Sequence, residues 1–263
     1  MEYYYRIPLY ILFGVLPSLI WLFYYLRKDL HPEPKRRIIE VFIYGILVTV
    51  PVFLLQTQLA ALLEQLGWLG WFDRYLVLAD VLKWFVVIAF TEELLKYLAV
   101  KLTILNSSAV DEPLDVMLYM VVVALGFAAL ENIFYLFSPI DNLSLDVIVK
   151  TTVSISFIRF VGATFLHTLC SGILGYCIAL SYCQPSKKFL FTFWGILLAT
   201  LLHGLYDFSI ITLQAPLNYL IPLGIILGLA VAVMAAFDQL KKIKGVCVVK
   251  PQINIQYATK KAR

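Results

Sequence analysis

The stretch from Val116 to Phe137 reads VMLYMVVVALGFAALENIFYLF and decides the fold class. It is 22 residues long and holds one charged side chain, Glu131. A helix needs about 20 mainly apolar residues to cross the hydrocarbon core of a bilayer. We therefore predict that this stretch is a transmembrane helix.

The rest of the chain has the same character. Of its 263 residues, 62% are hydrophobic and 14% are charged, whereas about a quarter of a typical soluble domain is charged. Further apolar runs lie at Ile7–Leu26, Ile38–Leu63, Lys83–Leu105, Phe160–Tyr182, Phe189–Leu213 and Leu217–Phe237. We predict an all-α, polytopic transmembrane bundle of about seven to eight spans. Residues 1–263 would form a single integral membrane domain.

Two stretches between these runs leave the span count open. Leu66–Leu82 mixes aromatic and charged residues, and Ser144–Ile158 mixes Asp146 and Lys150 with apolar residues. Either stretch could lie in the membrane interface, where tryptophan and tyrosine are favoured, or extend a neighbouring helix.

The distribution of lysine and arginine predicts the orientation, because cytoplasmic loops carry an excess of both. If the basic connection after the first span is cytoplasmic, fifteen of the 21 basic residues fall on that side. Four others, Arg6, Arg74, Lys150 and Arg159, fall on or near the other side. We expect an external N-terminus, a cytoplasmic C-terminus and a basic cytoplasmic tail over residues 241–263.

Polar side chains interrupt four of the predicted spans, and ionisable groups at membrane depth are functional candidates by default. In chain order they are Glu92, Glu93 and Lys96; Glu131 and Asn132; His167 and Ser171; and His203 and Asp207. Residues four apart share one face of a helix, so each span presents a polar stripe. Counted from the span ends, most of these groups lie about 9–15 Å from the outer boundary. We expect them to converge in the outer half of the membrane.

Some of these residues also have a purely structural explanation. Lys96 can neutralise a glutamate one turn back, and Asn132 or Ser171 alone would be typical of polar contacts between helices. Arg159 fits an interfacial residue and a site residue equally well. The set contains too many polar residues at similar membrane depth to be explained by packing alone.

Carboxylate and histidine together are suited to activating water. Of the adjacent Glu92 and Glu93, one could pair with Lys96 while the other acts as the base. His167 and His203 with a carboxylate from Glu131 or Asp207 could instead hold a divalent metal, zinc first, although the H-E-x-x-H spacing is absent. Metal-dependent and metal-free chemistry both stay open, whereas Ser171 lacks the context of a nucleophile.

The motifs resemble those of the PrsW family of intramembrane proteases, a branch of the superfamily that contains the CAAX prenyl proteases. The match rests on Glu92-Glu93-x-x-Lys96, Phe127-x-x-x-Glu131-Asn132, His167-x-x-x-Ser171 and His203-x-x-x-Asp207. An acidic loop, Asp29-Leu-His-Pro-Glu-Pro34, and Arg159 add to it. The resemblance extends from about residue 27 to residue 208.

The resemblance implies an intramembrane peptidase that makes the site-1 cut in a membrane-anchored anti-sigma factor. It also implies a multi-pass protein of the plasma membrane of a bacterial or archaeal-type cell. It implies catalytic roles for Glu92, Glu93, His203, His167 and Glu131, with Lys96, Asn132, Arg159 and Ser171 in support. Members of the family are usually classed as metalloproteases, whereas the CAAX branch looks metal-free. We expect a protein substrate and the lipid bilayer as partners, and no nucleic acid. The alternative is a proton-coupled transporter or ion pathway, which would use the same buried cluster as a proton relay.

Overall fold

The computed structural model describes residues 3–29, 31–68, 76–105, 107, 109–137 and 145–243, and this part of the chain contains helices and no β-strand. The α-helices are α1 (Tyr3–Leu26), α2 (Lys35–Trp68), α3 (Leu76–Val81), α4 (Thr91–Thr103), α5 (Pro113–Leu136), α6 (Leu145–Val161), α7 (Ala163–Cys183), α8 (Lys188–Thr212) and α9 (Leu217–Ile243). A π-helix, η1 (Leu82–Phe90), joins α3 to α4, and a short 3-10 helix, η2 (Pro185–Lys187), precedes α8.

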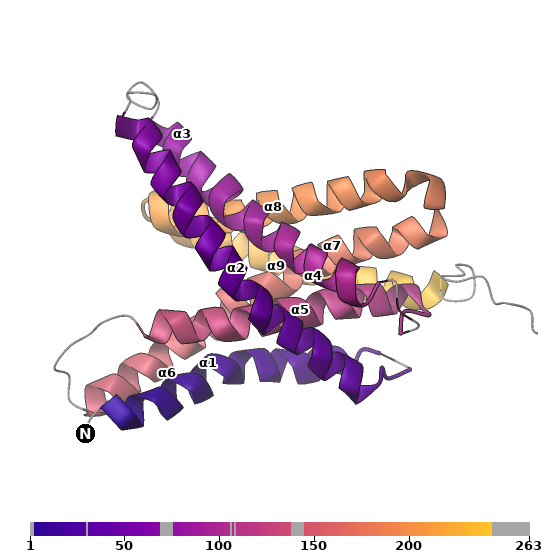
Figure 1. Ribbon diagram of the computed structural model, residues 1–263, viewed down its shortest axis with the longest axis horizontal. Helices are drawn as coiled ribbons and strands as arrows, with labels where there is room; N and C mark the ends of the chain where they lie inside the picture. Colours follow the sequence, from indigo (N-terminus) through magenta and orange to yellow (C-terminus); the bar gives the residue numbers. More distant parts are fainter. Residues whose placement is uncertain are drawn as a thin grey trace, which may run out of the picture.

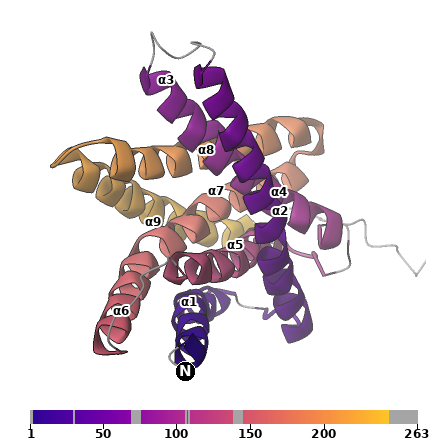
Figure 2. The same ribbon diagram turned by 60° about the vertical axis from the view of Figure 1, so that its left-hand side comes forward.

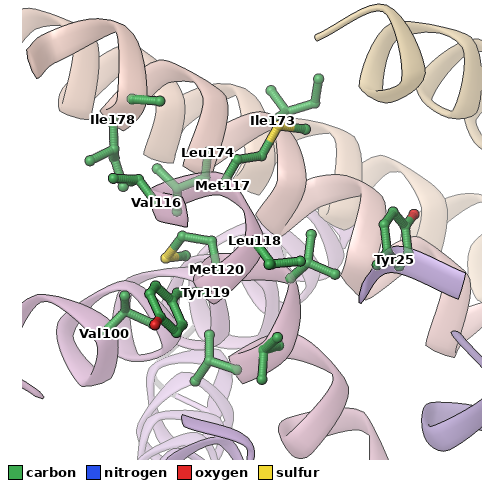
Figure 3. Packing of buried hydrophobic residues seen from close by; sticks show 14 of the residues in the cluster. Tyr25, Val100, Val116, Met117, Leu118, Tyr119, Met120, Ile173, Leu174 and Ile178 are labelled. Carbon is green, nitrogen blue, oxygen red and sulfur yellow. The ribbon is translucent and has the colours of Figure 1, made fainter. Parts of the chain in front are cut away.

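Helix α5, the stretch that opened the sequence analysis, is the central helix. It packs against α1, α2 and α7 and runs through the middle of the molecule (Figures 1 and 2). Side chains of Val116, Met117 and Met120 on α5 meet those of Ile173 and Leu174 on α7 in the buried core (Figure 3). A helix that is apolar on every side is typically enclosed by other helices, and α5 is.

Two glycines allow α2 to cross α5 at backbone contact. A Cβ atom on Gly126 would meet the carbonyl oxygen of Phe42, and one on Gly45 would meet the carbonyl oxygen of Val123. Small residues allow membrane helices to approach this closely. The crossing lies beside Phe127, whose carbonyl oxygen accepts a hydrogen bond of 3.4 Å from Thr49. The crossing therefore holds α2 against the turn of α5 that precedes Glu131.

The third predicted span forms one continuous helix with a π-helical middle. The segments α3, η1 and α4 follow one another without a break from Leu76 to Thr103 and run beside α2 and α8. The hydroxyl of Thr91 donates to the carbonyl oxygens of Val87 and Ile88, at 2.6 and 3.0 Å, at the end of the π-helix. The π-helix is rare and is often found at functional sites. Here it ends at Phe90, two residues before Glu92.

The two ambiguous stretches have different outcomes. Leu145–Val161, most of the second stretch, forms a separate helix, α6, that packs on α1 and meets α7 at Gly162 (Figure 2). Of the first stretch, Leu66–Trp68 extends α2, Leu76–Leu82 belongs to the third-span helix, and residues 69–75 lie outside the described residues.

Six helical segments of the described chain are long and apolar enough to cross a membrane. They include α1, α2, α5, α8 and α9, and α6 with α7 as one segment. The helix with Glu92 and Glu93 is too rich in charge to be among them. The prediction of an all-helical membrane protein is confirmed, whereas the count of seven to eight spans and the orientation stay predictions. Residues 244–263 of the predicted tail lie outside the described residues.

Candidate active site

The four polar motifs meet around one pocket of about 510 Å³. Helices α4, α5, α7 and α8 supply Glu92, Glu131, His167 and His203 to its wall. Helix α2 closes one side with Gln56, and Asp207 of α8 lies on the same wall. The sequence predicted this convergence, because buried polar groups in apolar helices must find one another.

Glu92 presents a free oxygen to the pocket. Its Oε1 accepts a hydrogen bond of 3.1 Å from Nε2 of Gln56. Its Oε2 is buried and has no hydrogen-bond partner. That atom lies 3.6 Å from Nζ of Lys96, 3.8 Å from Nδ1 of His167 and 3.9 Å from Nε2 of His203. An unsatisfied buried carboxylate oxygen is costly, so this atom is placed to take a ligand or a proton.

Glu93 lies behind the pocket wall and is fully buried. Its Oε1 lies 2.7 Å from Nζ of Lys96 and 3.0 Å from Nδ1 of His203. Its Oε2 accepts a hydrogen bond of 2.9 Å from the hydroxyl of Ser171. Both oxygens are thus engaged, and Glu93 joins α4 to α7 and α8.

Lys96 is completely buried and holds the orientation of His167. Its Nζ lies 4.4 Å from the centre of the Phe127 ring and 3.0 Å from Nδ1 of His167. An ammonium group is only a donor, so Nδ1 of His167 is the acceptor. Nε2 of that ring therefore carries the proton and donates to Oε2 of Glu131, at 2.9 Å.

Arg159 belongs to the site. Its Nη2 donates to Oε2 of Glu131 at 2.7 Å, and its Nε donates to Oδ1 of Asn132 at 2.5 Å. Asn132 in turn donates to the hydroxyl of Thr164 and to the carbonyl oxygen of Gly14. Arg159 and Asn132 therefore connect Glu131 to the surrounding helices, and the interfacial explanation of Arg159 is not needed.

His203 lies between carboxylates. Its Nδ1 faces Glu93, and its Nε2 lies 3.3 Å from Oδ2 of Asp207 and 3.9 Å from Oε2 of Glu92. Its ring is 5.0 Å from that of His167, centre to centre, at an interplanar angle of 84°. Both imidazoles thus border the free oxygen of Glu92.

Two contributors from α2 were not expected from the sequence. Gln56 bonds Glu92, and Thr49 lines the pocket. The signal was a polar side chain inside an apolar span, the same one that singled out the other motifs. A lone amide or hydroxyl is common in helix packing and carries less weight than a carboxylate.

Comparison with known proteins decides the family. A family model described as "PrsW family intramembrane metalloprotease" matches residues 33–237. The chain belongs to the PrsW family. "Protease PrsW" of Clostridioides difficile (strain 630) is 31% identical over 201 residues, which cover 75% of this chain and 77% of that protein. "Protease PrsW" of Geobacillus kaustophilus (strain HTA426) is 26% identical over 235 residues, 88% of this chain and 91% of the relative. No solved structure shows a significant match.

Membership in the PrsW family makes this chain an intramembrane peptidase of the bacterial cell membrane, with several membrane-crossing helices. The prediction of a peptidase is confirmed, and the family match does not support the transporter alternative. The family match covers all four polar motifs and the pocket wall that they build.

The donor set of this PrsW-family pocket fits a divalent metal. One atom each of Glu92, His167 and His203 lie within 4.8 Å of one another, all buried. The sequence pointed to Glu131 or Asp207 as the carboxylate ligand, but each of these approaches one histidine from outside this group. With neutral histidines, the site carries four carboxylates against two cations, a net charge of −2: Glu92, Glu93, Glu131 and Asp207 against Lys96 and Arg159. A divalent cation would balance that charge.

Proposed function

We propose that this protein hydrolyses a peptide bond of a membrane-anchored protein in the pocket between α2, α4, α5, α7 and α8, with Glu92 as the carboxylate that activates water. The observation that carries the proposal is the free Oε2 of Glu92, which is buried, borders the pocket and is flanked by His167 and His203. A general base must lie within reach of the water from which it takes the proton, and Glu92 alone of the two adjacent glutamates borders the pocket.

Glu93 is a positioning residue in this proposal. Its contacts with Lys96, Ser171 and His203 leave neither oxygen free for a substrate. It fixes the ring of His203 through Nδ1 and so directs Nε2 toward the pocket. This arrangement supports a division of labour between the two adjacent carboxylates.

The proton path follows from these positions. Oε2 of Glu92 takes a proton from water as the water oxygen bonds to the carbonyl carbon of the scissile peptide. The same proton then passes to the peptide nitrogen as the carbon–nitrogen bond breaks. In this path His203 is protonated, because both of its ring nitrogens face carboxylates, those of Glu93 and Asp207. Its Nε2–H then faces the space where negative charge develops on the carbonyl oxygen, and donors aimed at such charge contribute strongly to catalysis. Arg159 and Glu131 hold His167 on the other side of the pocket.

A metal-bound form is the alternative to this metal-free path. Glu92, His167 and His203, both histidines neutral, would hold a divalent metal in place of the proton-accepting role of Glu92, and Nδ1 of His167 would give up its hydrogen bond with Lys96. Zinc is the first candidate, because two imidazoles and a carboxylate are a common catalytic zinc set. When bound, such a metal supplies a Lewis acid that polarises water and the substrate carbonyl. The net charge of the site supports this assignment.

We propose a membrane-anchored anti-sigma factor as the substrate, because the family resemblance of the four motifs implies it. The charge pattern of the loops supports an external N-terminus and a site in the outer half of the membrane. The cut would then fall near the external end of the substrate helix and start release of its sigma factor.

Co-expression tests this function. Each single-span anti-sigma factor of the host would be expressed with the protein, and its fragments would be located by mass spectrometry. We expect the wild type to cut one of them near its external membrane boundary, and His203→Ala to leave it intact. Glu64→Gln on the exposed face of α2 is the matched control and should cut normally. Co-expressed wild type that cuts none of them would contradict the proposed substrate class. Loss of cleavage on chelation, restored by zinc, is the expected result for the metal.

A further inference from the structure

A second group of carboxylates lies at the opposite end of α5 from Glu131. Asp29 and Glu33 come from the connection between α1 and α2, and Asp115 comes from the first turn of α5. One oxygen of each lies within 4.8 Å of the others. Asp115 and Glu131 are 16 residues apart on one helix, or about 24 Å at 1.5 Å per residue. This acidic cluster is therefore separate from the active site.

In each carboxylate of the acidic cluster, one oxygen accepts hydrogen bonds that hold the side chain in place. Oδ1 of Asp29 accepts the backbone N–H of His31 at 2.9 Å. Oδ2 of Asp115 accepts the backbone N–H groups of Asp111 and Glu112, at 3.0 and 2.7 Å. Oε2 of Glu33 accepts a hydrogen bond from the hydroxyl of Tyr119, a residue whose ring is buried in the core (Figure 3). The carboxylates are fixed by the fold rather than free to move apart.

Oδ2 of Asp29 is the atom of the cluster that indicates a bound ligand. The residue is 9% exposed, and this oxygen is buried without a hydrogen-bond partner. Among the described residues, no lysine or arginine nitrogen lies within 4.0 Å of Asp29, Glu33 or Asp115. The neighbouring Arg37 pairs with Glu40 instead, at 2.8 Å.

The start of α5 does not by itself account for the cluster. Asp115 and Glu112 form a capping box, and the positive end of a helix favours nearby negative charge. Capping uses Asp115, however, and gives no reason for two more carboxylates from another segment to face it. Burial raises the pKa of Glu33, and the charges of Asp111 and Asp29 add a smaller rise.

We propose that Asp29, Glu33 and Asp115 bind one hard divalent cation, magnesium or calcium, that ties the α1–α2 connection to the start of α5. All donors in the cluster are carboxylate oxygens, which these two ions prefer, whereas zinc favours nitrogen and sulfur. Three protein oxygens leave the remaining coordination positions to water, as is usual for magnesium. The site is structural, because it holds the start of α5, the helix that also carries the crossing at Gly126 and the active-site residue Glu131.

Thermal unfolding of the full-length protein in detergent tests the site. After treatment with EDTA and its removal, the protein is titrated with magnesium or calcium chloride at constant ionic strength. We expect a saturable rise in Tm, because a ligand that binds only the folded state stabilises it. In Asp29→Asn, the rise should be absent or need at least ten times more cation. Asp146→Asn on α6, an exposed carboxylate, is the matched control and should respond like the wild type.

A direct binding measurement tests the proposal even if Asp29→Asn does not fold, because it needs only the wild type and Glu92→Gln. Manganese is added to the folded wild type and to Glu92→Gln, and its binding is followed by electron paramagnetic resonance. Retention in Glu92→Gln of a manganese site that magnesium displaces supports the acidic cluster. A wild type whose Tm neither cation changes, or an Asp29→Asn variant with an unchanged cation response, would overturn the proposal. If Asp29→Asn raises Tm without cation and the wild type shows no cation response, the cluster is held by shared protons instead.

Discussion

Nδ1 of His203 lies 3.0 Å from Oε1 of Glu93, while Nε2 of the same ring lies 3.9 Å from Oε2 of Glu92. Adjacent helical residues point about 100° apart, and the two glutamates use this difference to approach one imidazole from two sides. One carboxylate therefore orients the ring and the other shares the pocket with it. This geometry separates a stability role from a chemical role, and each can be tested alone.

Glu93→Gln should reduce stability more than any other single change at the site. It leaves Lys96 buried without its 2.7 Å ion pair. Breaking a buried pair by removing one partner costs about 3–5 kcal/mol. Unfolding in detergent, followed by circular dichroism, measures the loss. Asp146→Asn breaks the exposed pair with Lys150 and should cost only about 0–1 kcal/mol.

The double variant Glu93→Gln/Lys96→Met checks the cause. It removes both charges of the 2.7 Å pair but leaves the buried Glu92 without its 3.6 Å contact to Lys96, so it should regain only part of the stability that Glu93→Gln loses. A double variant as unstable as Glu93→Gln would show that the carboxylate matters for its bonds to Ser171 and His203 and not for the charge of Lys96.

Gln56→Leu should slow cleavage and leave the fold intact. The amide donates to Oε1 of Glu92 and so fixes the direction of Oε2. A hydrogen bond to a charged group contributes about 1.5–3 kcal/mol, which corresponds to a rate about 10–100 times lower. Kinetics of peptide cleavage in liposomes give kcat and KM, and we expect kcat to change. Gln58→Leu, on an exposed position of α2, should cleave at the wild-type rate.

Arg159→Lys should not preserve activity although it keeps the charge. The guanidinium bonds Glu131 and Asn132 at once, and a lysine cannot reproduce this fork. Loss of one charged hydrogen bond predicts a fall in kcat of about tenfold or more. Lys150→Gln on the same helix is the control. Equal cleavage by Arg159→Lys and the wild type would assign Arg159 a charge role only.

Gly126→Ala and Gly224→Ala should change stability in opposite directions. The first places a methyl group on the carbonyl oxygen of Phe42, and overpacking costs about 1–3 kcal/mol or more. The second has no atom within 4 Å of the new methyl, so the higher helix propensity of alanine should stabilise by up to about 1 kcal/mol. Midpoints of thermal unfolding compare the two. A tolerated Gly126→Ala would contradict the close crossing of α2 and α5.

The sequence predicted the helices and the meeting of the motifs for a physical reason. Apolar runs of membrane length leave few alternatives to helices, and carboxylates and histidines inside them must face one another. Lys96 was expected to reach one of the two glutamates a turn back, and it bonds Glu93. Only its contacts with Glu131 and Asn132 in the structure show that Arg159 belongs to the site.

Other features depend on three-dimensional detail that a pattern lacks. Adjacent residues of a helix lie about 100° apart around its axis, so the sequence predicts that Glu92 and Glu93 point in different directions. It does not predict which one faces the pocket, because η1 and the packing on α2 set the rotation of α4. The break at Gly162 separates α6 from α7 within one apolar run. A Cβ there would meet the hydroxyl of Tyr206 at 2.7 Å, a contact between distant segments.

The role of Glu92 is the central claim, and single-turnover cleavage tests it most directly. The protein in liposomes, in excess over a single-span substrate, would be compared as wild type and Glu92→Gln, with substrate binding measured on the same samples. We predict unchanged binding and a cleavage rate lower by at least about a hundredfold, within the range that general base catalysis contributes. A folded Glu92→Gln variant that cleaves at the wild-type rate would contradict this account.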